Sequence, residues 1–471
     1  MGRWGHDAMS HGARGWGACW ALMWLAVACE RPEEVAPSPS LEAPPAAESS
    51  LKAKTPTGRT RWLRSLAGAG RERAAGLAHD SRGNVVLALN SEAAVADLFG
   101  PLLVPGSGAP VSQRFGVAKY GTGGERMWSS SLPGFAEAVT VSSRGHVFVA
   151  GRNPEGADLG GGPLPAGRFL LKLGRDGDFL WARSLGALGV SPDFVLRRVE
   201  ADLLGNVVLA GTLPDAKLGG VPALVKVDAK GGYLWTYAHE EPGEASGVAA
   251  DPEGHLYVTG LLHPPRSPVT LDSQPFLVKL DARGRLQWEQ RLDTGAGGAA
   301  GVAVHGNRVV MTGAFSAPLT FGEQTHVVEP GGSEAFVAAF DREGTPRWLR
   351  TFGFEGLDLA TDEDDGVTVV GRYAHGDDLG AGPVVGAPGG TLNLFLVKLD
   401  RVDGALRWVR GFPMAQSGDG GSSVERLFVS SSRKGASAFL GARLSAMDFG
   451  TGVLGEPEGG GQELFLGGFE P

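Results

Sequence analysis

Apolar and polar residues alternate along most of the chain, in short runs separated by turns rich in Gly, Asp and Asn. Successive side chains of a strand point to opposite faces of a sheet, so a period of two indicates β-strands. Two such runs on either side of a Gly- and Asp-rich turn are typical of a β-hairpin. From residue 59 onward the pattern therefore predicts an all-β domain built from hairpins.

One hairpin recurs six times and always ends in tryptophan. The six copies read GVAKYGTGGERMW (116–128), FLLKLGRDGDFLW (169–181), ALVKVDAKGGYLW (223–235), FLVKLDARGRLQW (276–288), FVAAFDREGTPRW (336–348) and FLVKLDRVDGALRW (395–408). A second hairpin precedes each copy, as in RVEADLLGNVVLAG (198–211). Two hairpins make four strands, and a four-stranded sheet can cover its faces only by stacking on neighbouring sheets.

The number of tryptophan strands predicts the number of sheets. Six repeats are complete, whereas the last has strands near 424–443 and 463–469 but lacks its tryptophan strand. A matching strand, 59–66 with Trp62, stands at the other end of the repeat region. We expect it to complete the last sheet, so that residues 59–471 form a seven-bladed β-propeller of four-stranded blades without an open seam. The alternative is a β-solenoid or a series of small sandwiches, which would leave both incomplete ends unexplained.

The repeat also resembles known families. GNVVLAG (205–211), then a loop such as DLGGGPL (158–164) or MDFGTGVL (447–454), then FLVKLDARGRLQW follow one another in this order. This order resembles the SBBP-type β-propeller repeat of bacterial extracellular proteins. That resemblance implies an exported protein and supplies no catalytic residues. The tryptophan strand is also similar to the tryptophan-docking repeats of quinoproteins and of the lipoprotein subunit of the outer-membrane β-barrel assembly machinery, whose propellers typically have eight blades.

The first 58 residues have a different character. Basic residues precede an apolar stretch that ends in small residues directly before Cys29, which is typical of a secretory signal. These small residues resemble a bacterial lipobox, which implies acylation of Cys29. We expect a signal peptide over 1–28, lipidation at Cys29, and a Pro/Ala/Glu-rich linker over 29–58. The expected location is the cell envelope, as an outer membrane lipoprotein; ordinary signal cleavage further along the chain is the alternative.

Charge and cysteine content exclude some function classes. The net charge of −9 and pI of about 5.6 leave no basic footprint for nucleic acid. The second cysteine, Cys19, lies inside the signal segment, so the exported domain would have no disulfide. The composition therefore favours neither a nucleic-acid partner nor thiol chemistry.

The strongest candidate for metal chemistry is the acidic run 362–365. It loosely resembles a calcium loop, but other repeats have an ordinary turn at this position and no glutamate follows at the required spacing. Asp and Gly are what such turns need for conformational reasons, so a solvated turn is favoured.

Other recurring residues have structural explanations. The histidines fall at repeat turns, as His146 and His255 do after a turn glycine. The recurring lysine is expected to lay its stem along the blade and to reach a turn carboxylate or water. The tryptophans are expected to pack the blades. Motifs for serine hydrolases or phosphate loops do not occur. We therefore predict no catalytic, cofactor or metal site, and no bound cofactor.

Three functions remain open. The first is a monomeric binding or scaffold protein, anchored to the membrane by lipid, that presents its loops to protein or polysaccharide partners. The longest connection, 90–115, is the place where we expect specificity. The second is a lyase or hydrolase at the mouth of the central channel, and the third is an accessory lipoprotein of barrel assembly. Ionisable groups that converge on the channel with perturbed pKa values would favour an enzyme, whereas small apolar residues would oppose one.

Overall fold

A computed structural model describes residues 58–66, 72–91, 113–263, 273–386, 393–414, 426–443, 446–450, 453–455 and 463–471. The predicted signal peptide (1–28), Cys29 and nearly all of the predicted linker lie outside the described residues, as do residues 92–112 of the longest connection. Within the described ranges no helix is long and apolar enough to cross a membrane.

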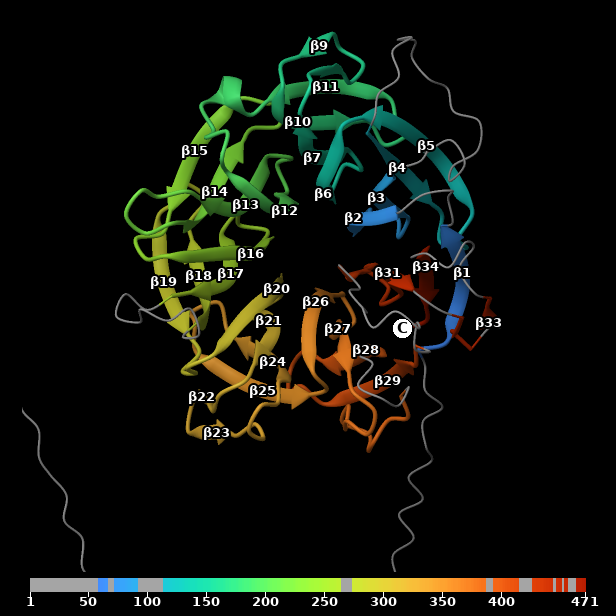
Figure 1. The fold of residues 1–471 in the computed structure, drawn as a ribbon, viewed down its shortest axis with the longest axis vertical. Helices are drawn as coiled ribbons and strands as arrows, with labels where there is room; N and C mark the ends of the chain where they lie inside the picture. Colours follow the sequence, from blue (N-terminus) through green and yellow to red (C-terminus); the bar gives the residue numbers. More distant parts are fainter. Residues whose placement is uncertain are drawn as a thin grey trace, which may run out of the picture. The chain divides into compact units, whose positions relative to one another are not determined.

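Seven antiparallel four-stranded sheets surround a central axis (Figure 1). The innermost strands are β2 (Glu72–His79), β6 (Phe135–Val141), β12 (Val195–Ala201), β16 (Gly243–Ala250), β20 (Gly297–His305), β26 (Glu355–Thr361) and β30 (Phe428–Ser431). The second strands are β3 (Val85–Ser91), β7 (Val147–Asn153), β13 (Val207–Leu213), β17 (Leu256–Leu262), β21 (Arg308–Phe315), β27 (Gly366–Tyr373) and β31 (Ser437–Arg443).

The third strands are β4 (Arg114–Tyr120), β10 (Gly167–Leu173), β14 (Val221–Val227), β18 (Gln274–Leu280), β24 (Glu334–Phe340), β28 (Asn393–Asp400) and β34 (Glu463–Phe469). The outermost strands, which carry the tryptophans, are β5 (Arg126–Pro133), β11 (Phe179–Ser184), β15 (Tyr233–Ala238), β19 (Leu286–Arg291), β25 (Pro346–Phe352), β29 (Leu406–Phe412) and β1 (Thr60–Leu66). The predicted seven-bladed propeller of four-stranded blades is confirmed.

The seventh blade is closed by the first strand, as predicted. β1 pairs with β34 in an antiparallel register that runs from Thr60–Phe469 to Leu66–Leu464. The pairing continues one step beyond the strands, since the Glu470 N–H donates to the Arg59 carbonyl at 2.8 Å. β1 (blue) and β34 (red) therefore lie side by side although they come from opposite ends of the sequence (Figure 1).

The core lies between neighbouring blades. The middle strands are apolar on both faces, as in β14, whose seven residues are all buried. Such strands form because each sheet is covered by one neighbouring blade on each of its two faces. The repeat predicts this stacking. The blades are numbered one to seven from β2 to β30.

Two faces of the ring differ in their connections. The hairpin-turn face carries the short turns within both hairpins of each blade, and the long-loop face carries the connections between the hairpins and between the blades. Small two-stranded sheets form on long connections of three blades. They are β8–β9 (Ala157–Asp158 and Pro163–Leu164), β22–β23 (Leu319–Phe321 and Gln324–His326) and β32–β33 (Met447–Asp448 and Val453–Leu454). The helical content of the described residues is one short 3₁₀ turn, η1 (Gly186–Leu188), between the second and third blades.

Candidate functional site

The outer tryptophans pack each blade against the next one. Trp128 of the first blade donates its Nε1–H to the Arg175 carbonyl of the second blade at 2.9 Å. Its ring covers Gly177, where an added Cβ would come within 2.9 Å of it. Gly177 has φ +87, so glycine supplies both the conformation and the space. The same pair of contacts is made by Trp62, Trp235, Trp288 and Trp348. The predicted packing role of the tryptophans is confirmed.

The recurring lysine also connects two blades. Lys119 Nζ lies 2.7 Å from Asp80 in the inner turn of its own blade and 3.3 Å from the carbonyl of Arg175 in the next blade. Lys226 and Lys398 pair with Asp202 and Asp362 at 3.1 and 2.8 Å, and Lys172 and Lys279 donate to carbonyls of the next blade at 2.9 and 2.8 Å. The expected turn carboxylate is confirmed for three lysines, and the contact with the next blade is an addition.

The inner strands carry a β-bulge at the same place in six blades. The residues that follow the bulge are Gly76, Ala138, Arg198, Gly247, Gly301 and Asp358. A bulge re-aims the side chains next to it. Four blades therefore have Gly or Ala at this level of the channel, whereas the third and the sixth blades have charged side chains.

These two charged side chains meet across the channel. Arg198 Nη2 lies 2.5 Å from Asp358 Oδ1, and Asp358 Oδ2 accepts the N–H of Val429 in the seventh blade at 3.1 Å. The guanidinium also lies over the Phe428 ring at 5.6 Å. A Cβ on Gly301 would come within 3.2 Å of the Asp358 carboxylate, so the glycine makes room for the pair. Burial raises the pKa of Asp358, and the charge of Arg198 opposes this rise.

Cavities lie on both sides of this ion pair. Arg198 lines one of about 320 Å³ on the long-loop side. Glu200, two residues further along β12 and so roughly 7 Å away, lines one of about 380 Å³ on the hairpin-turn side, together with His79 and His305. Burial raises the pKa of Glu200 to about 7, although Arg198 and the hydroxyl of Thr140, 3.5 Å away, oppose it. Burial also lowers the pKa of His79 to about 4.

Replacing Glu200 by Gln is expected to remove a pH dependence of stability. The folded pKa of about 7 exceeds the ordinary value of 4.5, so the folded state holds the proton more tightly. The stabilisation is complete below pH 4.5 and is lost as the pH rises through 7. At most roughly 3 kcal/mol is at stake for a shift of this size. The measurement is the difference in urea unfolding free energy between the wild type and Glu200→Gln from pH 4.5 to 8.

The comparison with the variant is needed because His79 changes the unfolding free energy with pH in the opposite direction. Its folded pKa is below the ordinary 6.5, so its contribution is lost as the pH falls from 6.5 to about 4. A difference curve that stays flat over the whole range would mean that the pKa of Glu200 is ordinary.

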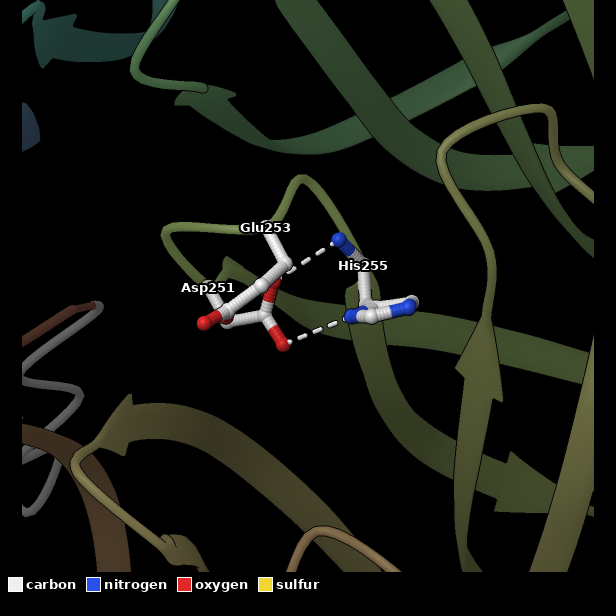
Figure 2. A group of neighbouring side chains, drawn as sticks. All are labelled: Asp251, Glu253 and His255. Atoms are coloured by element: carbon white, nitrogen blue, oxygen red, sulfur yellow. Dashed lines mark hydrogen bonds and ion pairs between the residues drawn. The ribbon is translucent and has the colours of Figure 1, made fainter.

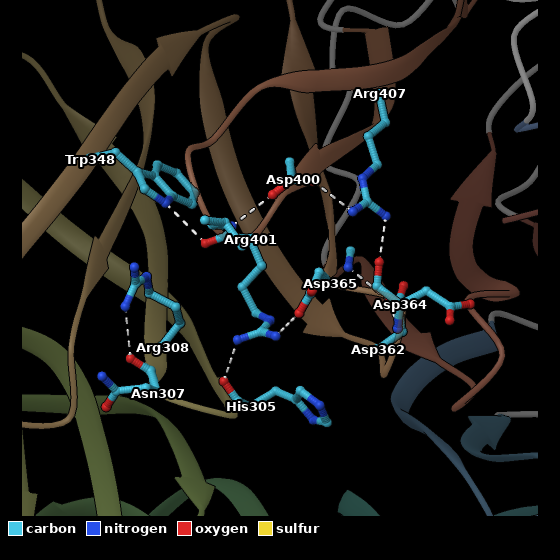
Figure 3. A network of polar contacts seen from close by, with 12 residues as sticks. His305, Asn307, Arg308, Trp348, Asp362, Asp364, Asp365, Asp400, Arg401 and Arg407 are labelled. Atoms are coloured by element: carbon cyan, nitrogen blue, oxygen red, sulfur yellow. Dashed lines mark hydrogen bonds and ion pairs between the residues drawn. The ribbon is translucent and has the colours of Figure 1, made fainter.

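The acidic run 362–365 forms the inner turn of the sixth blade, as predicted (Figure 3). Asp362 Oδ1 accepts the N–H groups of Asp364 and Gly366 at 3.0 and 2.8 Å. Its other oxygen pairs with Lys398, and both side chains are almost fully buried. The expectation of a solvated turn is therefore wrong for Asp362, because the lysine between the blades needs a buried carboxylate at this position.

The other members of the run contact separate cations. Asp365 pairs with Arg401, which also donates to the His305 carbonyl of the fifth blade at 2.7 Å (Figure 3). The Arg401 carbonyl in turn accepts the Nε1–H of Trp348 at 3.0 Å. Glu363 Oε1 lies 3.4 Å from Arg433 Nε in the seventh blade. The carboxylates thus point toward separate cations of the sixth and seventh blades and do not converge on one point.

A second acidic group lies in the inner turn of the fourth blade (Figure 2). Asp251, Glu253 and His255 offer ligand atoms within 4.8 Å of one another. However, His255 Nδ1 already lies 3.0 Å from Asp251, and Arg342 of the fifth blade lies 2.7 Å from Glu253 and 3.8 Å from Asp251. Both carboxylates thus have a cationic partner in the guanidinium, so this group acts as an ion-pair contact between blades.

The histidines lie at the turns where the sequence places them. His146 and His255 directly precede β7 and β17, and His79 and His305 end β2 and β20. Of these four, His79 and His305 line the cavity beside Glu200. His79 Nδ1 lies 2.7 Å from Ser430 Oγ.

The solved structures that are similar to this chain are distant in sequence. A protein of unknown function from Dyadobacter fermentans is 13% identical, with 88% of this chain and 99% of that chain covered and a TM-score of 0.45. Quinohemoprotein alcohol dehydrogenase from Comamonas testosteroni is 11% identical, with 88% and 77% covered and a TM-score of 0.39. No curated protein matches the sequence.

The matching family model is the one described as outer membrane protein assembly factor BamB, over residues 223–454. This segment runs from the third strand of the third blade to the long connection of the seventh. The match supports the expected resemblance to the lipoprotein subunit of the barrel assembly machinery, and the SBBP-type resemblance stays a prediction. The chain is thus a seven-bladed β-propeller that is similar, over residues 223–454, to the assembly factor BamB.

Proposed function

We propose that the protein is a non-catalytic binding or scaffold protein of the cell envelope, and that it assists the assembly of outer membrane proteins. It is held at the outer membrane by a lipid on Cys29 and acts as a monomer on protein or polysaccharide partners. The match to an outer membrane protein assembly factor supports the role. A rigid ring that presents variable connections suits partner recognition.

The observation that carries the proposal is how the ring uses its interior charges. Lysines pair with turn aspartates of their own blade, Arg198 pairs with Asp358 across the channel, and Arg443 pairs with Glu463 in the seventh blade. A buried pair is costly to break because each partner would be left as an uncompensated charge. These groups therefore hold the blades in place, and recognition is left to the surface.

We expect the long-loop face to bind the partner. The three small hairpins β8–β9, β22–β23 and β32–β33 project from connections on this face, so it varies from blade to blade. The hairpin-turn face consists of short turns that repeat closely in sequence. Variation on a fixed frame is what specificity for one partner requires.

Replacing Cys29 by Ser is expected to release the protein from the membrane. The acyl chains attached to the cysteine would be the anchor, and two chains are needed for stable attachment. After cell lysis the wild type should sediment with outer membranes and the variant should stay in the soluble fraction. If the variant sediments with the membranes as the wild type does, lipidation of Cys29 is not the anchor.

The assembly role is tested in cells that lack the protein. The amount of β-barrel proteins in isolated outer membranes, measured by quantitative mass spectrometry, is expected to fall at least twofold. The wild-type chain should restore it, whereas the Cys29→Ser chain, present in equal amount, should not. Unchanged levels of outer membrane proteins in the deletion strain would contradict the role.

A lyase or hydrolase is the second candidate, and Glu200 is the observation that favours it. A carboxyl with a pKa of about 7 beside a cavity is suited to general acid or base catalysis near neutral pH. The test is turnover of a panel of envelope polysaccharides by the purified protein. Loss of turnover in Glu200→Gln with an unchanged unfolding midpoint would support an enzyme, and absence of turnover in the wild type would exclude these substrates.

A further inference from the structure

The seventh blade, like the fifth, lacks the lysine that connects the other five blades to their neighbours. In each blade the outer tryptophan faces one residue of the third strand across the sheet. These residues are Lys119, Lys172, Lys226, Lys279, Ala339, Lys398 and, opposite Trp62, Gly468. A Cβ on Gly468 would collide with the ring of Trp62, so this position accepts no side chain.

The missing lysine leaves a hollow at the seam between the seventh and first blades. In the first blade the head of Lys119 fills this place, between Asp80 of its own inner turn and the Arg175 carbonyl of the next outer turn. The corresponding residues at the seam are Ser432 and Thr122. Both line a cavity of about 420 Å³ together with Gly468. We call this cavity, between Gly468, Ser432 and Thr122, the seam pocket.

The seam pocket is lined by cationic side chains from three separate segments. They are Arg61 of β1, Arg82 of the first inner turn, and Arg433 and Lys434 of the last inner turn. The acidic side chain of the lining, Glu363, pairs with Arg433 at 3.4 Å. Within the described ranges no carboxylate lies within 4.0 Å of the other three cations. A local excess of positive charge thus stands out on a chain whose net charge is −9.

The turn residues of the seam strengthen this excess. Asp80, Asp202, Asp251 and Asp362 occupy the first position of the inner turn in four other blades. The seventh blade has Ser432 there, so it lacks the carboxylate as well as the lysine. The hydroxyls of Ser432 and Ser437 and the backbone of Gly83 remain at the wall of the pocket. Hydroxyl and guanidinium groups are suitable donors for the oxygens of a tetrahedral anion.

We propose that the seam pocket binds the phosphate monoester of a larger polar group. Four cationic side chains against the one acidic side chain of Glu363 favour an anion of more than one charge, and a phosphate monoester carries roughly −1.5 to −2 at pH 7. The cavity lies within the roughly 300–1,000 Å³ of small-molecule sites and exceeds what a bare phosphate fills. The phosphate therefore belongs to a larger polar group, either on a membrane lipid or on a soluble molecule.

The test uses the full chain with Cys29→Ser, so that no acyl chain of its own enters a membrane. Inorganic phosphate is titrated calorimetrically at low salt, where exposed charges are least screened. Arg82→Gln combined with Lys434→Gln is expected to weaken binding at least tenfold. Arg144→Gln is the matched control, because Arg144 takes the place of Arg82 in the second inner turn but lies outside the pocket. It should bind phosphate as the parent does.

A second variant keeps every cation and changes the pocket itself. Ser432→Asp installs the carboxylate that four other blades carry at this turn position, so the turn should fold while phosphate binding is lost. Equal unfolding midpoints for all variants show that the fold is intact. Phosphate binding that survives both Ser432→Asp and the double variant would overturn the proposal, as would no binding by the parent.

Vesicles distinguish the two sources of the phosphate. If vesicles that contain phosphatidic acid, a lipid phosphate monoester, sediment the parent chain, if the double variant stays behind, and if inorganic phosphate competes, the group is a lipid headgroup. If inorganic phosphate binds but the vesicles do not, the group belongs to a soluble molecule. Both results support a phosphate site at the seam and are independent of the assembly role.

Discussion

A chain that begins at residue 72 is expected not to fold into a stable ring. It lacks β1, so β34 keeps its pairing with β31 but loses its hydrogen-bonding partner on the outer edge along the whole register. Trp62, Leu63 and Leu66 are also removed from the core around the seventh blade. Backbone hydrogen bonds at about 0.5–1.5 kcal/mol each and buried apolar side chains at about 1.5–3 kcal/mol each make a loss on the order of 5–10 kcal/mol. That is comparable with the roughly 5–15 kcal/mol by which a domain is stable.

Urea unfolding followed by tryptophan fluorescence and gel filtration measures this loss. The control is a chain that begins at residue 58, which keeps β1 and should unfold as the full chain does. A peptide of residues 58–66 added to the shortened chain should restore the transition, and the same peptide with Trp62→Ala should restore it less. Equal midpoints for the chains that begin at 58 and 72 would show that the first strand is dispensable.

Replacing Lys398 by Met is expected to cost about 3–5 kcal/mol, the usual penalty for breaking a buried ion pair from one side. Its partner, Asp362, is 2% exposed and would keep an uncompensated charge between the sixth and seventh blades. The hydrogen bond from Lys398 to the Gly435 carbonyl at 2.6 Å would be lost as well. The unfolding free energy in urea gives the size of the effect.

Lys172 offers a matched control. It has the same place in the second blade but donates to the Ala229 carbonyl, and the first residue of its inner turn is Ser142 instead of an aspartate. Lys172→Met should therefore cost only about 1 kcal/mol, as for one hydrogen bond. In the Lys398→Met background, Asp362→Asn should recover most of the loss. Equal costs for the two lysine variants would mean that the buried carboxylate does not matter.

The fold could be predicted from the sequence because its repeat is long and its ends are informative. Six tryptophan hairpins define the blade, and the surplus strand around Trp62 matches the strand missing from the last repeat. The sequence could not show which blade each lysine and tryptophan side chain contacts. The sequence shows that a lysine and a tryptophan recur in the same hairpin, but only the ring shows that Lys119 and Trp128 both reach Arg175 of the next blade.

The ion pair between Arg198 and Asp358 was not predicted, although the sequence contains a signal for it. Aligned on the bulge, the inner strands carry Gly or Ala in four blades and Arg198 or Asp358 in the other two. The same alignment places Glu200 where the fourth and fifth blades have Ala249 and Ala303. A charged residue at an inward position where other blades have a small one therefore indicates a specific contact in the channel. Which two of these charged residues meet across the channel depends on the number of blades between them, and a single repeat does not contain this information.

The solvated reading of the acidic run failed for a related reason. Considered alone, a run of carboxylates at a turn is expected to face water. Asp362 instead faces Lys398, which approaches from the third strand of the same blade, and Asp365 faces Arg401. The cations lie more than thirty residues away in the sequence, so only the closed sheet brings them to the turn.

The pairing of Thr60 with Phe469 also orders events during folding. Loop-closure entropy grows with the length of the closed segment, and contacts this distant in sequence form slowly. Until the last strand is available, β1 has no partner within its own chain and presents an open edge. An open edge pairs readily with another copy, which leads to strand exchange at high concentration. The yield of closed monomer should therefore depend on how dilute the chains are while the final strand arrives.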